Sequence, residues 1–174
     1  MGLDMYLSKR TYVWSEDRDK LRIEGLAAPV DPTKVKYILE DAGYWRKANA
    51  IHRWFVEQVQ DGNDDCGVYM VSREQLAELL ATVERVLEAS DLVDGEVTTG
   101  YRYRDGKEEP IVQQGKVIKD ATMARELLPT QAGFFFGGTA YGQGYVDDLQ
   151  ETRRILTEAL ADPDAEEFEY GSSW

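Results

Sequence analysis

The sequence predicts a single α+β domain, residues 1–174, with about three long helices packed on a mixed or antiparallel sheet and a projecting β-hairpin. Three observations favour this class. The length of 174 residues suits one hydrophobic core. Apolar residues make up 43% and charged residues 30%, as in ordinary folded proteins. Segments with the two-residue period of strands also alternate along the chain with segments of helical period.

The first third of the chain is predicted to contain two strands. Apolar and polar side chains alternate over residues 3–13, which predicts the first strand. Asp31 followed by Pro32 fits the start of a short helix. The apolar residues at alternate positions from 35 to 39 favour a strand instead, and we predict the strand. Gly43 then interrupts the chain.

The middle of the chain is predicted to contain two helices separated by a strand. The first helix covers residues 44–59, and residues 66–71 (CGVYMV) form a short buried strand. Ser72 and Gln75 have the spacing of a capping box, in which each side chain satisfies a free backbone N–H of the other residue. The second helix therefore starts there and continues to about Ala89.

Residues 96–119 are predicted to form a hairpin. Aromatic and basic residues alternate from 101 to 104, and Asp105 with Gly106 supplies a tight turn. We interpret this hairpin as an insertion within the domain.

The last third is predicted to contain two helices and two strands. A short helix covers residues 121–128, and residues 133–137 (GFFFG) form a buried strand. A long amphipathic helix follows at 145–161. The aromatic residues of the tail, from 168 to 174, predict an additional edge strand.

The charge excludes several kinds of partner. The chain has 33 acidic and 20 basic residues, a net charge of −13. Long-range repulsion argues against direct binding of nucleic acid and of anionic membranes. A local basic patch can still bind a small anion, and the acids can imitate DNA phosphates toward a host protein. No apolar run is long enough for a membrane span, and the start lacks the apolar region of a secretory signal.

Cysteine and histidine are too few for common metal and disulfide frameworks. One Cys and one His leave no zinc site and no internal disulfide. Residues 61–65 resemble a calcium loop, but its required glycine and final glutamate are replaced by Cys66 and Ser72. We predict no metal and no cofactor, and a reducing cytoplasm fits the single thiol.

The segment YWRKANAIHRWF, residues 44–55, supplies the candidate ligand-binding residues. On a helical wheel its apolar residues form a core face, and mixed aromatic and polar residues form the two flanks. A stacking ring, an amide and an imidazole on one flank suit a small polar ligand, with a cation on the other flank. The predicted ligand-binding residues are Trp45, Lys47, Asn49, His52 and, from the aromatic segment near 134–141, Tyr141. The alternative is a boundary helix whose aromatic residues only pack.

Two further patterns resemble parts of catalytic or nucleotide-binding sites. His52 with Cys66 is the smallest pair for a thiolate nucleophile, and Asp64 or Asp65 could orient the imidazole. A cysteine in a buried strand is more often a small apolar side chain. The glycine-rich segment 137–144 fits neither a Walker loop nor a dinucleotide motif, and we interpret it as a connector or lid.

Several segments together resemble a family of small acidic proteins from bacteriophage and prophage genomes. These are MGLDMYL, GYWRKANAIHRWFV, DDCGVYMV and LPTQAGFFFGGTAYGQGY followed by DDLQETRRIL. The hairpin matches least, and Gly142 replaces an acid that the family more often carries after the tyrosine. The resemblance implies an accessory protein in the cytoplasm of a bacterial host and no particular mechanism.

Taken together, the sequence predicts a protein that binds a small polar ligand or a host protein without catalysis. The first alternative is a hydrolase or transferase that uses His52 with Cys66 or an aspartate such as Asp65. The second alternative is an acidic DNA mimic that inhibits a host protein.

Overall fold

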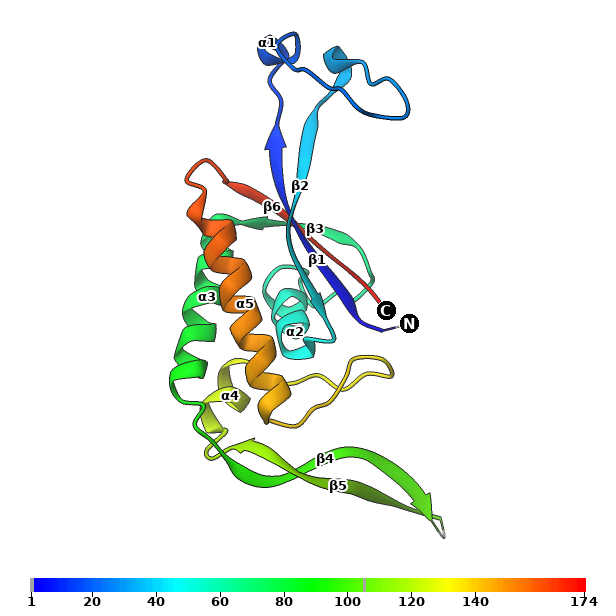
Figure 1. The fold of residues 1–174 in the computed structure, drawn as a ribbon, viewed down its shortest axis with the longest axis vertical. Helices are drawn as coiled ribbons and strands as arrows, with labels where there is room; N and C mark the ends of the chain where they lie inside the picture. The colour runs from blue at the N-terminus through cyan, green and yellow to red at the C-terminus, as the bar shows by residue number, and fades with distance from the viewer. Residues whose placement is uncertain (1, 105) are drawn as a thin grey trace.

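The computed structural model describes residues 2–104 and 106–174, and it shows an α+β fold with antiparallel sheets (Figure 1). A four-stranded sheet has the order β2-β1-β6-β3, and a separate hairpin pairs β4 with β5. The strands are β1 (Asp4–Tyr12), β2 (Tyr37–Arg46), β3 (Val68–Ser72), β4 (Leu92–Arg104), β5 (Lys107–Ile118) and β6 (Glu167–Ser173). The helices are α1 (Ser15–Arg18), the 3₁₀ turn η1 (Pro32–Lys34), α2 (Asn49–Gln58), α3 (Arg73–Glu88), α4 (Thr122–Leu127) and α5 (Gln143–Ala161).

The four-stranded sheet has one covered face and one open face. Residues paired across strands share a face, and those on the covered face are buried. They include Met5, Leu7, Trp45, Val71, Phe168 and Tyr170. The opposite face exposes large apolar and aromatic side chains, namely Tyr6, Tyr44, Val68 and Met70. The alternation that predicted the first strand is therefore the alternation between these two faces.

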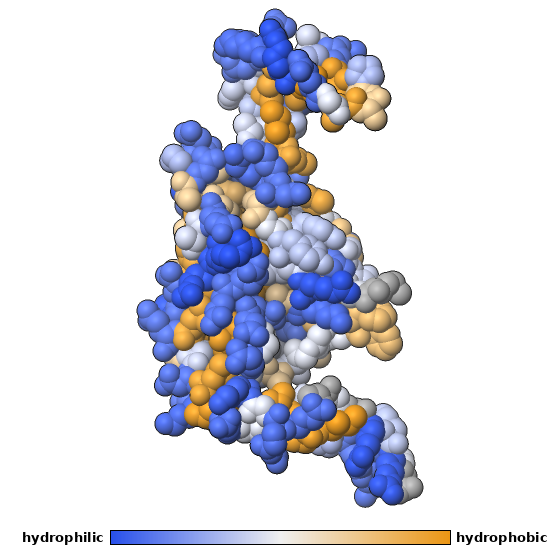
Figure 2. Space-filling view, viewed as in Figure 1, coloured by the Kyte–Doolittle hydropathy of each residue, from blue (hydrophilic) through white to orange (hydrophobic). Residues whose placement is uncertain are grey.

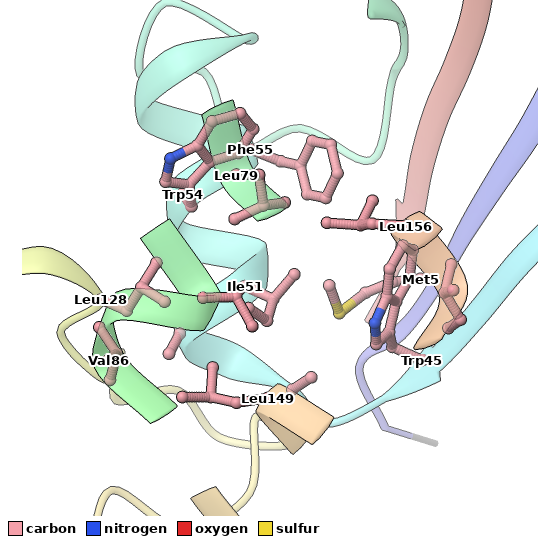
Figure 3. Packing of buried hydrophobic residues seen from close by; sticks show 14 of the residues in the cluster. Met5, Trp45, Ile51, Trp54, Phe55, Leu79, Val86, Leu128, Leu149 and Leu156 are labelled. Atoms are coloured by element: carbon pink, nitrogen blue, oxygen red, sulfur yellow. The ribbon is translucent and has the colours of Figure 1, made fainter. Parts of the chain in front are cut away.

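Helices α2, α3 and α5 supply the core on the covered face (Figure 3). The ring of Phe55 from α2 stacks on Tyr170 from β6, with centroids 3.8 Å apart. Trp45 lies beside Met5 in the core, and its Nε1 donates to Thr152 Oγ1 of α5 at 2.9 Å. Burial of these side chains removes apolar surface from water, which is the main stabilising contribution to the fold.

The capping box predicted from Ser72 and Gln75 is confirmed at the start of α3. The Gln75 N–H donates to Ser72 Oγ, and the Ser72 N–H donates to Gln75 Oε1. Helix α5 and the short α4 also occupy the predicted segments, within two residues at each end. Residues 31–39 contain both the helical start and the strand that their sequence suggested. Asp31 accepts from the Thr33 N–H at the start of η1, and strand β2 begins at Tyr37.

The helix predicted for residues 44–59 is correct only from Asn49 to Gln58. Tyr44 to Arg46 complete strand β2, and α2 begins at Asn49. Lys47 has φ of 62°, a left-handed conformation that separates the strand from the helix. The helical wheel was therefore wrong for Trp45 and Lys47. Pairing of β2 with β1 decides this segment, and a local pattern does not show pairing.

Three other expectations are corrected by the structure. Cys66 lies in an exposed turn before β3, with φ of 57°, and β3 alternates instead of being wholly buried. The segment 133–137 forms a turn in which Phe134 is exposed and Phe136 is buried. The tail does form a strand, but β6 lies inside the sheet between β1 and β3 instead of at its edge.

Two β-ribbons project from opposite ends of the body (Figure 1). The predicted projecting hairpin is β4–β5, between the end of α3 and the start of α4, and it begins at Leu92 instead of residue 96; position 105 of its turn lies outside the described residues. Its interpretation as an insertion stays a prediction. The outer parts of β1 and β2 form a second ribbon, which carries exposed hydrophobic side chains (Figure 2). No helix in the described part of the chain is long and apolar enough to cross a membrane.

Candidate functional site

A cleft of about 560 Å³ lies where the inner half of the hairpin, the 128–142 loop and the first turns of α2 and α5 meet. This volume is in the range of small-molecule binding pockets. Polar side chains line it from each of these elements, including Asn49, Thr98, Gln113, Gln114, Thr130 and Gln143. We call this cavity the cleft.

Charged side chains of the cleft are mostly basic. Arg46 and Lys47 enter it from the end of β2, and Lys116 enters from β5. The ammonium group of Lys116 lies 2.7 Å from Asp94 Oδ1. Among the described residues that line the cleft, the one acid is Asp148, on the second turn of α5. The cleft is thus a local positive region in a protein whose net charge is −13.

Asp148 has an unusual titration. Burial raises the pKa of its carboxyl group to about 7, and the nearby carboxylate of Asp147 adds to the effect. No hydrogen bond to this carboxyl group is recorded among the described residues. A carboxyl group with a strongly raised pKa beside a cleft is a common feature of functional sites.

Glycines shape the floor of the cleft. Gly137 has φ of 91°, and an added Cβ would lie 3.1 Å from the Cβ of Lys47, so a side chain there would disturb the loop. An added Cβ at Gly138 or Gly144 meets nothing within 4 Å. The cleft therefore has free space directly above these two backbone positions.

Helix α5 begins in the cleft without a side-chain cap. Its N-cap is Gly142, which has no side chain to accept from the first N–H groups. Helix α2 begins nearby with Ala48 as its N-cap, again with no side-chain cap. Unsatisfied N–H groups at helix starts favour negative charge.

His52 lies outside the cleft, in a second polar group that we call the His52 cluster. Its members are His52, Asp64, Gln131, Tyr170 and Trp174. His52 is fully buried, with Nδ1 2.7 Å from the Tyr170 hydroxyl and Nε2 3.0 Å from Asp64 Oδ1. Asp64 also accepts from Trp174 Nε1 at 3.0 Å and from Gln131 Nε2 at 3.3 Å. Both imidazole nitrogens therefore already have partners inside the protein.

The hydrogen bonds assign the proton of His52. A carboxylate only accepts, so Nε2 carries the proton and donates to Asp64. In the neutral ring Nδ1 then accepts from the Tyr170 hydroxyl. Burial lowers the pKa of His52, and this effect outweighs the opposing influence of Asp64. Burial likewise raises the pKa of Tyr170, which keeps its hydroxyl proton.

Asn49 connects the His52 cluster to the cleft. Its Nδ2 donates to the carbonyl oxygens of Phe136 (3.0 Å) and Gly138 (2.9 Å), and its Oδ1 accepts from the Gln131 N–H at 2.9 Å. The side chain is almost wholly buried. Asn49 lines the cleft, but its polar atoms hold the 131–138 segment in place.

The other predicted ligand-binding residues divide between core, loop and cleft. Trp45 is a buried core residue and does not line the cleft. The Tyr141 hydroxyl accepts from the Thr130 N–H at 3.1 Å, and its ring lies under the guanidinium of Arg125. These contacts hold the two ends of the 130–141 segment together. Lys47 is the predicted residue whose charged group is available in the cleft.

The proposed nucleophile pair is not assembled. Cys66 is exposed, and both nitrogens of His52 are bonded to other groups. Asp65 accepts from the Gly67 N–H and the Tyr69 hydroxyl, while Asp64 is the acid that contacts His52. Of the two predicted acids, Asp64 therefore has the position to orient the imidazole. The Cys66 thiol is not a hydrogen-bond partner of His52.

Comparisons with protein-family models, with curated protein sequences and with solved structures found no match. Sequence reasoning missed Lys116 and Asp148, which line the cleft together with Arg46. Lys116 and Asp148 lie on β5 and α5, and no local spacing relates them. The glycine-rich segment predicted a loop at 137–144, but it did not predict the free space beside Gly144.

Proposed function

We propose that this protein binds a small polar ligand in the cleft and does not convert it chemically. The observation that carries this proposal is the convergence of basic side chains, amide side chains and glycine backbone on one cavity of about 560 Å³. The resemblance to phage and prophage proteins makes an accessory role in the cytoplasm of a bacterial host part of the same proposal.

The position of His52 supports binding over catalysis. A general base needs a free nitrogen within hydrogen-bond reach of its substrate. In this fold both nitrogens of His52 are engaged, and the residue lies outside the cleft. A hydrolase or transferase that used His52 with Cys66 or Asp65 would first have to break the contacts with Asp64 and Tyr170.

The acidic composition is the remaining support for a DNA mimic or for binding of a host protein. The charge is unevenly distributed. Residues 9–36, on the projecting ribbon, contain seven basic and five acidic residues, whereas the rest of the chain contains 13 basic and 28 acidic residues. A surface that imitates DNA would therefore have to lie on the body of the molecule, away from this ribbon.

The cleft can be tested by filling it. Gly144 lies in the first turn of α5, and an added side chain there meets free space. We expect Gly144→Leu to fold with unchanged or slightly higher stability, by up to about 1 kcal/mol, because Leu is a better helix former than Gly. Compounds that raise the melting temperature of the wild-type protein should no longer do so in this variant.

The matched control is Gly100→Leu, on β4, where an added Cβ makes only an ordinary contact with Ile111 and the position does not line the cleft. This variant should keep the full ligand response. The proposal fails if no compound in a chemically diverse set stabilises the wild-type protein. It also fails if folded Gly144→Leu responds to ligands as the wild type does.

A further inference from the structure

We infer that the ligand of the cleft carries an anionic group, a phosphate or a carboxylate, which binds among Arg46, Lys47 and Lys116. This inference rests on the proposed function of the cleft and specifies the chemistry of its ligand.

The cleft differs from the other prominent cavities of the described chain because most of the charged residues that line it are basic. The cavity between α3 and α5 has three carboxylates and one arginine, and its volume of about 570 Å³ is similar. Two smaller cavities also contain more acids than bases. The cleft contains three bases and one acid. In a protein of net charge −13, this local reversal favours an anion there and disfavours a cation.

Two of the three basic groups, those of Arg46 and Lys47, are available for a ligand, whereas Lys116 pairs with Asp94. Within the described residues, the side chains of Arg46 and Lys47 have no recorded hydrogen bond or ion pair, and both are exposed. The left-handed conformation of Lys47 projects its side chain past Gly137, whose missing side chain leaves room for it. A non-glycine residue rarely adopts this conformation without a structural or functional reason.

Backbone groups at the start of α5 add to this preference. Helix α5 presents the start of its dipole to the cleft, with Gly142 as N-cap and Gly144 in its first turn. The lysine and arginine side chains come from β2 and β5, on other sides of the cavity. An anion in the cleft would thus meet positive charge from three elements.

Asp148 is the one lining group of opposite sign. Its raised pKa, about 7, reduces its average charge near neutral pH. The protonated carboxyl group can donate a hydrogen bond, and the ionised form can accept one. A ligand that carries a second polar group could therefore bind the basic residues through its anionic group and Asp148 through the polar group.

The experiment measures binding of inorganic phosphate and, separately, of citrate to the full chain, at constant ionic strength maintained with sodium chloride. Isothermal titration calorimetry or thermal shift should show saturable binding of at least one anion. The phosphate and citrate arms distinguish phosphate from carboxylate recognition. Loss of one charge-assisted hydrogen bond should weaken binding by about tenfold or more in Lys47→Met. Met keeps the aliphatic stem that packs against Gly137.

Lys107→Met is the matched control, because this lysine lies at the far end of the hairpin and does not line the cleft. Its affinity for the anions should equal that of the wild type. Equal affinities in Lys47→Met, Arg46→Met and Lys107→Met would show nonspecific ion binding and overturn the inference. The anion inference also fails, while the proposed function stands, if only neutral or cationic compounds bind and Gly144→Leu abolishes their binding. If Gly144→Leu affects no ligand at all, the proposed function itself fails.

Discussion

The His52 cluster and the cleft both contact the 130–138 segment, but they use polar side chains in opposite ways. In the His52 cluster the polar groups are hydrogen-bonded to one another. The imidazole bonds to Asp64 and to the Tyr170 hydroxyl, and Asp64 also accepts from the Trp174 indole. In the cleft, the side chains of Arg46 and Lys47 make no hydrogen bond or ion pair with the residues that the structure describes, and glycines leave open space. The residue types that most often carry chemistry are thus used for structure, and the available surface comes from lysine, arginine and backbone.

The largest expected effect is on the His52 cluster. His52→Ala should lower the free energy of unfolding by about 3 kcal/mol or more, because it leaves a cavity and two polar groups without their partner. Urea denaturation measures this. Arg53→Ala is the control, since Arg53 is exposed and pairs only with Glu57; it should change stability by about 0.5 kcal/mol or less. A His52→Ala protein of normal stability that lost ligand binding would contradict the structural role of the cluster.

The next effect concerns the residue that joins the two regions. Asn49→Ala removes three hydrogen bonds to the 131–138 segment, and we expect a loss of about 2 kcal/mol. The Gln131 amide should then exchange its hydrogen faster, and ligand binding should weaken because the cleft loses its fixed wall. Asn63→Ala, which removes one bond to Gln60 in a turn, is the control.

The outcome that would contradict this role of Asn49 is specific. Ligand binding would be lost in Asn49→Ala while exchange of the Gln131 amide stayed as slow as in the wild type. Asn49 would then contact the ligand directly instead of positioning the loop.

The smallest effect is expected from the acid in the cleft. The pKa of Asp148 is about 7 in the folded protein, above its ordinary value of 3.8, so the folded state binds more protons between these two values. Its contribution to stability is therefore fully present below about pH 4 and is lost as pH rises through 7. Asp148→Asn should be more stable than the wild type at pH 8 by about 1–2 kcal/mol, since partial exposure reduces the effect.

Unfolding at pH 4, 6 and 8 checks this prediction, with Asp91→Asn as an exposed control. The difference between Asp148→Asn and the wild type should grow with pH, whereas Asp91→Asn should follow the wild type. The pKa of His52 is lowered, so its contribution changes in the opposite direction, with stability lost as pH falls below about 6.5. A difference that did not vary with pH would rule out the raised pKa of Asp148.

The sequence by itself determined the elements whose signals are local. Alternation predicted β1, a capping box predicted the start of α3, and an amphipathic period predicted α5. These patterns are reliable because each depends on groups within a few residues of one another. The α+β class and the projecting hairpin followed from them.

Only the tertiary structure decided the features that depend on distant partners. Trp45 belongs to a strand because β2 pairs with β1, and the tail became an inner strand because β1 and β3 accept it on both sides. The Phe134–Phe136 segment forms a turn, in which the Phe135 carbonyl accepts from the Leu3 N–H and Phe136 is buried. For the site, the sequence identified Lys47 as a candidate cation but could not relate it to Lys116 or Asp148. Their meeting depends on how β2, β5 and α5 pack, and residue spacing along the chain carries no information on that packing.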